Sequence, residues 1–232
     1  MAKGARKPPR KKPTSTHELA SHEKYLAKVP REVTRRQLRA YRLSDSVMDV
    51  VSIVCIADEI SNKFAKWRDF IHPLDPVSLD DLKNWFGVPN EAARRQLNET
   101  RTMSANGQMW GRLTRVRVKN LPTQRNFDFT RLDSEQRLAV RQMANNLLYG
   151  YVDAEEARRP QTAAVISYML DQSRALHPKV FVAPNLIVCP DDHIVFDHIP
   201  VLYFNNILVY GEGQITTRGH TKIDAVQIRH VD

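Results

Sequence analysis

Histidine, cysteine and aspartate side chains are concentrated near the C-terminal end of the chain, and they are its candidate metal ligands. Five of the eight histidines lie after residue 176, together with Cys189, Asp191, Asp192 and Asp197. On facing strands, Cys189, His193 and His198 could ligate zinc. Their spacing matches none of the usual zinc-ligand patterns, and His and Asp are ordinary residues at the turns of β-proteins. The sequence therefore predicts no metal site and no cofactor.

The chain also lacks the short motifs of common enzymes. It has no Gly-x-Ser-x-Gly elbow, no phosphate-binding P-loop and no Gly-x-Gly-x-x-Gly fingerprint. Its carboxylate pairs, Asp80-Asp81, Glu155-Glu156 and Asp191-Asp192, are adjacent in sequence. Neighbouring side chains tend to diverge, so these pairs do not converge on one substrate. The sequence predicts a protein that is not an enzyme.

Positive charge is concentrated at the N-terminal end. Residues 1–42 hold thirteen Lys or Arg against three Glu, while residues 43–232 hold 22 basic against 23 acidic residues. Clustered cations release counterions from a phosphate backbone, so this arm indicates a nucleic-acid partner. Its only aromatic rings are Tyr25 and Tyr41, which favours binding without sequence preference. The candidate phosphate-binding residues are Lys3, Arg6, Lys7, Arg10, Lys11, Lys12, Arg35, Arg36 and Arg39.

A second candidate for nucleic-acid binding lies in residues 78–119. Ser78 opens a short helical pattern, Gly87-Val88 is a turn signal, and the next helical pattern presents Arg94, Arg95 and Gln96. The basic residues 112–119 alternate as in a strand. The segment resembles a helix-turn-helix with a wing. That resemblance implies base reading by Arg94, Arg95 and Gln96, and an ordinary corner between two helices is the alternative.

The elements that would carry these residues divide the chain into three predicted parts. Residues 1–42 form a partly disordered arm, residues 43–176 a helical domain, and residues 177–232 a small all-β module. Helices are predicted over 44–73 and after Ser78, Asp133 and Pro160, and Gln136 completes a capping box with Asp133. The predicted fold class is α+β, a mainly helical N-terminal domain followed by a sandwich or solenoid-like C-terminal module.

Two strands of the β-module are apolar on both faces, which predicts self-association. Residues 201–204 and 207–210 are almost continuously apolar, and so short a module has few elements to cover them. The residues expected in this contact are Tyr203, Phe204, Leu208 and Tyr210. The chain is therefore expected to be a homo-oligomeric structural protein, of coat or nucleoid type, whose basic arm binds nucleic acid. The alternative is a winged-helix transcription regulator whose β-module dimerises or senses a ligand.

The cysteines and the apolar segments of the sequence indicate where in the cell the protein is expected. Cys55 and Cys189 lie far apart in sequence, and both are interpreted as reduced core thiols. The first residues lack the apolar core of a secretory signal, and the stretch 47–60 is too short and too charged to span a bilayer. We therefore expect a cytoplasmic or nucleic-acid-associated protein with no membrane partner.

Overall fold

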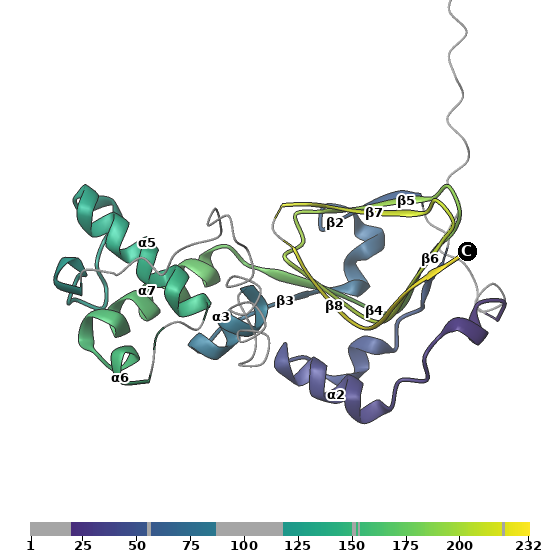
Figure 1. The fold of residues 1–232 in the computed structure, drawn as a ribbon, viewed down its shortest axis with the longest axis horizontal. Coiled ribbons are helices and arrows are strands. Elements are labelled where there is room, and N and C mark those ends of the chain that lie inside the picture. The colour runs from purple at the N-terminus through teal and green to yellow at the C-terminus, as the bar shows by residue number, and fades with distance from the viewer. Residues whose placement is uncertain (1–19, 55–56, 87–117, 150–151, 153, 220) are drawn as a thin grey trace, which may run out of the picture. The chain divides into compact units, whose positions relative to one another are not determined.

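The computed structural model describes residues 20–54, 57–86, 118–149, 152, 154–219 and 221–232 (Figure 1). The chain divides into two units, one made of residues 1–72 and 179–232 and the other of residues 73–178. These boundaries differ from the predicted parts 43–176 and 177–232, because residues before the helical unit belong with the C-terminal strands. The helical unit is thus an insertion within the β-rich one.

The β-rich unit consists of parallel strands with helices between them. Sheet A has the order β1-β4-β6-β8 with β3 also paired to β4, and sheet B has the order β2-β5-β7. All of the strand pairs with a defined register are parallel. The elements are η1 (Glu23–Tyr25), α2 (Arg31–Ala40), η2 (Asp45–Met48), β1 (Ile53–Val54), β2 (Asp58–Ser61), η3 (Ala65–Phe70), β3 (Ile71–Pro73), β4 (Lys179–Val188), β5 (His193–Asp197), β6 (Val201–Tyr210), β7 (Gln214–Arg218) and β8 (Lys222–Val231).

The predicted α+β fold is therefore wrong, and the chain is α/β. The error lies in residues 44–73, whose apolar spacing suggested one long helix. They instead form η2, β1, β2, η3 and β3, of which β1 pairs with β4 and β2 with β5. This stretch is rich in β-branched Val and Ile, which pack well on a sheet. Pairing with strands from the far end of the chain overrides the local helical pattern.

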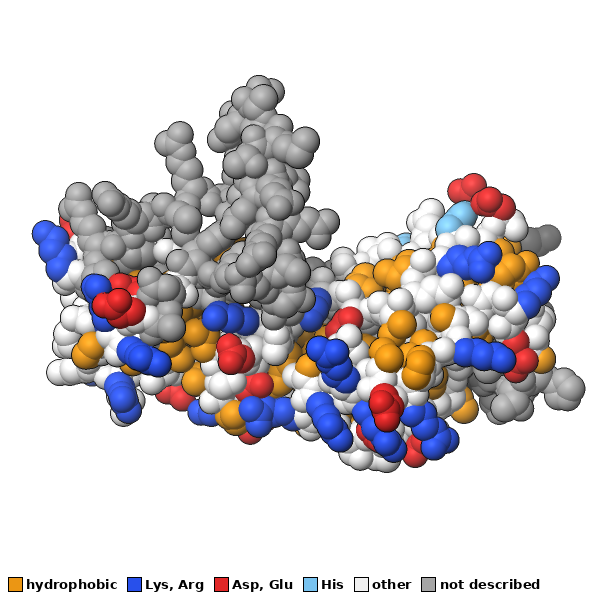
Figure 2. All heavy atoms as spheres, turned by 60° about the horizontal axis from the view of Figure 1, so that its bottom comes forward, with side chains coloured by type: hydrophobic (Ala, Val, Ile, Leu, Met, Phe, Trp, Pro, Cys, Tyr) orange, Lys and Arg blue, Asp and Glu red, His pale blue; other side chains and the backbone are white. Residues whose placement is uncertain are grey.

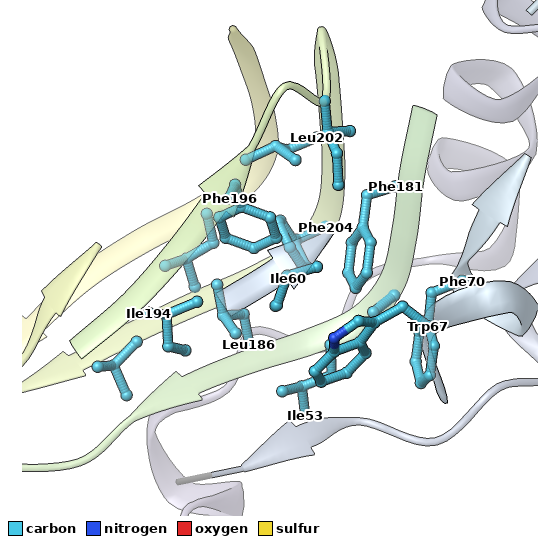
Figure 3. Close-up of a cluster of buried hydrophobic side chains, with 14 residues drawn as sticks. Ile53, Ile60, Trp67, Phe70, Phe181, Leu186, Ile194, Phe196, Leu202 and Phe204 are labelled. Carbon is cyan, nitrogen blue, oxygen red and sulfur yellow. The ribbon is translucent and has the colours of Figure 1, made fainter. Parts of the chain in front are cut away.

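The strands wind as successive turns of one parallel β-coil, a name we use for β4 to β8 together with β1 and β2. The chain returns to the same position once per turn, since Val180 pairs with Val201 and Val201 with Lys222. Inward side chains of successive turns stack into a buried apolar core (Figure 3). Phe181 lies at its centre, with ring centroids 5.4 Å from those of Phe70 and Phe196.

The inserted unit is helical, and the helices predicted after Ser78, Asp133 and Pro160 are confirmed. Of the predicted strand 112–119, residues 112–117 lie outside the described residues, and Val118 and Lys119 belong to the 3-10 helix η4. Its elements are α3 (Leu79–Phe86), η4 (Val118–Asn120), η5 (Phe129–Arg131), α5 (Ser134–Leu148), α6 (Ala154–Ala157) and α7 (Pro160–Ala175). Asp133 and Gln136 form the predicted capping box, and Pro160 begins α7. Leu82, Met143, Leu147 and Val165 meet in the core of this unit. None of the described helices is long and apolar enough to cross a membrane.

Candidate nucleic-acid interface

Helix α2 carries three of the predicted phosphate-binding residues, and one of its faces is bound to the β-coil. Leu38 and the residue that follows the helix, Tyr41, are almost fully buried. The Thr34 hydroxyl donates to Asn205 Oδ1 at 3.1 Å, and the Tyr41 hydroxyl donates to Asp224 Oδ2 at 2.7 Å. Thr34, Leu38 and Tyr41 are four and three residues apart, so they form one stripe on the helix. This stripe fixes α2 against the outer face of sheet A (Figure 1).

The opposite face of α2 is basic and exposed. Arg35, Arg36 and Arg39 are all exposed. Arg36 and Arg39 lie on the side of the helix away from the docked stripe, and Arg35 lies at its flank. Arg35 forms an ion pair with Asp45, and Glu32 shares the face. Residues 20–42, which we call the basic segment, hold seven Lys or Arg against two Glu. Figure 2 shows Lys and Arg side chains gathered with a few carboxylates over this part of the molecule.

A ladder of polar side chains fixes the start of the basic segment. Asn185 Nδ2 donates to Ser52 Oγ at 2.9 Å, and Asn206 Nδ2 donates to Asn185 Oδ1 at 2.7 Å. The backbone N–H of Ala27 donates to Asn206 Oδ1 at 3.0 Å and to Gln227 Oε1 at 2.9 Å. Because Asn206 is buried, its amide must keep these partners to avoid a desolvation cost. The ladder therefore links residue 27 directly to β6 and β8, and through Asn206 to Asn185 of β4.

Replacing Asn206 with alanine should lower the free energy of unfolding by about 1–2 kcal/mol, because Asn185 Oδ1 and the Ala27 carbonyl lose a buried donor. Urea unfolding measures this change. Limited proteolysis should also cut faster at Lys24 and Lys28, since the basic segment is held less firmly. The control is Asn145→Ala on the exposed side of α5, which should change stability by no more than about 0.5 kcal/mol. Equal effects of the two variants would contradict the role of the ladder.

The contact between α2 and sheet A contains ionisable groups with shifted pKa values. Burial and the neighbouring Asp224 carboxylate raise the pKa of Tyr41 well above its usual range. Burial raises the pKa of Tyr203 to about 12. Burial also lowers the pKa of Lys222, although Asp224 acts in the opposite direction. The two tyrosines are thus uncharged hydrogen-bonding groups at physiological pH, and they serve the docking of α2.

The residues predicted for self-association lie inside the chain instead. Tyr203, Phe204 and Leu208 are fully buried. Tyr25 and Leu26 pack against the cluster that contains Leu208, and the Tyr210 hydroxyl lies 2.9 Å from His22 Nδ1. The prediction for this surface is therefore wrong. Phe204 belongs to the core inside the β-coil, and the chain's own residues Tyr25, Leu26 and Tyr41 cover Leu208 and Tyr203 on the outer face of sheet A. The sequence gave no sign that residues 20–42 pack on sheet A.

The remaining candidate residues are placed as follows. Lys3, Arg6, Lys7, Arg10, Lys11 and Lys12 lie outside the described residues, and so do Arg94, Arg95 and Gln96. Cys189 is disulfide-bonded, which corrects its interpretation as a reduced thiol, and Cys55 lies outside the described residues. His193 Nε2 lies 2.8 Å from Thr216 Oγ1, and His198 occupies a left-handed corner at φ 52°. Only the α2 arginines are brought together as a described group.

Sequence reasoning missed the flanking members of the basic surface. Lys28, Arg31 and Arg42 are exposed and lie just before, at and just after the ends of α2. The spacing of Thr34, Leu38 and Tyr41 was the signal that could have found the docked face and hence the whole basic surface. No family model, curated protein or solved structure matches the chain.

Proposed function

We propose that this protein is a non-enzymatic, self-associating structural protein that binds nucleic acid through its basic N-terminal residues 1–42. The observation that carries the nucleic-acid part is the orientation of α2. Leu38 and Tyr41 of its docked stripe are buried on sheet A, while Arg36 and Arg39 are exposed on the opposite side of the helix and Arg35 is exposed at its flank. A helix held in this way presents its cations at fixed positions, which lowers the entropy lost when they contact a phosphate backbone.

The chemistry of this surface favours phosphates over bases. Arginine binds phosphate oxygens with its planar fork of N–H donors. The rings of the basic segment are engaged within the protein, since Tyr41 is buried and Tyr25 packs edge-on against Tyr210 at 5.9 Å. With both tyrosine rings of this described segment occupied, neither is open to stack on a base. Binding should therefore depend weakly on sequence and strongly on salt.

The double variant Arg36→Ala/Arg39→Ala should weaken binding to random-sequence duplex DNA or RNA. Each lost phosphate contact reduces the slope of log affinity against log salt by about 0.9 on a B-form DNA duplex, so the slope should become shallower by nearly 2. Fluorescence anisotropy over a salt series measures this slope. Thermal unfolding should change little, because both side chains are exposed.

The matched control is Arg125→Ala/Arg158→Ala, which removes the same charge from exposed positions of the helical unit. It should leave the slope unchanged if α2 makes the contacts. Equal losses in the two double variants would mean that only overall charge matters, and the α2 proposal would fail. A preferred duplex recovered from a random pool, and lost on replacing Arg94, Arg95 and Gln96, would instead favour the winged-helix regulator.

A further inference from the structure

The last turn of the β-coil leaves apolar side chains uncovered. Strand β8 is the end strand of sheet A, and β6 is its neighbour among the described strands. Ile223 and Ile228 are 42% and 65% exposed. The strand register places Ile223 beside Leu202 and Ile228 beside Ile207, and both of those neighbours are buried. Two stacks of inward apolar side chains therefore end in an exposed isoleucine on β8, next to the outer edge of this strand.

The other end of the β-coil is closed. Trp67 and Phe70, from η3, are buried in the same core, and both rings lie against Phe181. The indole N–H of Trp67 donates to the carbonyl of Glu59 at 3.3 Å. The inside of this end is therefore filled by aromatic side chains, while Val51 before β1 and Phe64 before η3 are exposed. The two ends therefore differ, because inward side chains are uncovered at β8 and are covered by the rings of η3 at the other end.

We propose that the open end binds a second copy of this chain, β8 pairing antiparallel with the partner's β8 about a two-fold axis. This inference rests on the self-association part of the proposed function and assigns it to a surface other than the one the sequence suggested. Pairing of like edges is self-complementary, so it closes as a dimer. It supplies backbone partners for the outer edge of β8 and covers the exposed isoleucines.

The shape of β8 selects one register for this pairing. Its ladder with β6 is interrupted at Val226, and the inward positions are Ile223 and Ala225 before this corner and Ile228 and His230 after it. A bent strand pairs with an antiparallel copy only where the two corners coincide. Matching inward with inward positions then places the axis between Val226 and Gln227. If the two β8 strands were shifted by one residue, inward side chains of one strand would lie opposite outward side chains of the other.

The selected register is also favourable in charge. It places Asp224 opposite the partner's Arg229, and the two-fold axis repeats this pair. Directly opposed side chains in an antiparallel pair are about 5 Å apart at Cβ, close enough for an ion pair. Arg229 is exposed, and the Asp224 carboxylate can accept further hydrogen bonds beside that of Tyr41. Ala225 would lie opposite the partner's Ile228, so a small side chain faces a large one.

The chain's own N-terminal residues are a poor alternative cover for this edge. Residues 1–16 contain Pro8, Pro9 and Pro13, which lack the N–H that strand pairing needs. They also contain no Val, Ile, Leu or aromatic side chain to cover Ile223 and Ile228. A second β8 supplies both the backbone groups and the apolar surface.

The first test is the mass of the full chain in solution without nucleic acid, by light scattering after nuclease treatment at high salt. Wild type should be a dimer at micromolar concentration. Ile228→Lys should weaken dimerisation by at least about tenfold, because it places two symmetry-related charges in the apolar contact. Val51→Lys is the matched control, since Val51 is 56% exposed in the same unit but outside β8, and it should remain dimeric.

The second test checks the register independently of stability. Ile223→Cys chains mixed with His230→Cys chains should form a disulfide-linked dimer on mild oxidation, because these positions are opposite each other. Neither variant alone should cross-link at its new cysteine, since the two copies of position 223 lie about 20 Å apart along the paired strands. Wild type under the same conditions controls for the native cysteines. The far-UV circular dichroism of each variant should match that of wild type.

The inference would be overturned by a monomeric wild type, by an Ile228→Lys variant that stays dimeric, or by cross-linking no greater in the mixture than in each variant alone. Filaments would overturn it as well, because a two-fold pair closes. Nucleic-acid binding is measured separately on the same samples. A dimer that fails to bind nucleic acid would reject the binding part of the proposed function and leave this inference standing. A monomer that binds nucleic acid would reject this inference and leave the binding part of the proposed function standing.

Discussion

Replacing Phe181 with alanine should lower the free energy of unfolding of the β-rich unit by about 3–5 kcal/mol. Phe181 is fully buried, and its ring packs against the rings of Trp67, Phe70, Phe196 and Phe204. Removing the ring loses its burial and leaves a cavity that these rigid neighbours fill only partly. Urea unfolding followed by near-UV circular dichroism and tryptophan fluorescence measures the loss, since Trp67 reports on this cluster.

The control for this prediction is Phe64→Ala, which removes the same ring from the same unit. Phe64 is 46% exposed, so the change should cost much less, about 1 kcal/mol or below. A cost for Phe181→Ala similar to that of Phe64→Ala would show that the aromatic cluster does not hold the coil together. The helical unit should keep its own transition in both variants, because its core is a separate cluster.

Raising the pH from about 9 to about 12 should destabilise the β-rich unit by at least about 2–3 kcal/mol. Tyr203 has its pKa raised to about 12 by burial, against 10.0 for a free tyrosine. Between these values the unfolded chain has released the proton and the folded chain still holds it, so stability falls as pH rises. The raised pKa of Tyr41 acts in the same direction, and the lowered pKa of Lys222 opposes it.

Urea unfolding at several pH values tests this directly, with Tyr203→Phe as the informative variant. This variant should lose about 1 kcal/mol at neutral pH, because the hydroxyl no longer donates to Asn205 Oδ1. It should then show a shallower decline with pH than wild type. Tyr149→Phe, at an exposed ring in the helical unit, should follow wild type. Identical pH curves for wild type and Tyr203→Phe would contradict the proposed cause.

The predictions that the structure confirms rest on signals contained within a few neighbouring residues. The capping box of Asp133 and Gln136 satisfies backbone donors of the same helix turn, so it works wherever the helix lies. Pro160 likewise begins α7 because its ring suits the first helical position. The basic charge of residues 1–42 is also a property of composition alone. For the same reason, Arg35, Arg36 and Arg39 could be named as candidates before their positions were known.

Residues 44–73 show where local reasoning ends. Their apolar positions fit a helical period, but the partners that decide their structure are in β4 and β5, beyond the whole inserted unit. Tyr203 and Leu208 show the same limit. Their apolar character correctly indicated a covered face, but the sequence could not show that residues 25–41 of the same chain cover it.

The sequence by itself determined helices α3, α5 and α7 of the inserted unit, the concentration of charge at the N-terminal end and the strand-like character of residues 177–232. The tertiary structure decided the parallel winding, the membership of residues 53–73 in the sheets and the face of α2 that is exposed. The repeat length of the β-coil could not be recognised in the sequence, because equivalent positions in successive turns need only the same apolar or polar character and not the same residue. Phe181, Leu202 and Ile223 share one position without sharing identity, and only the strand register brings them together.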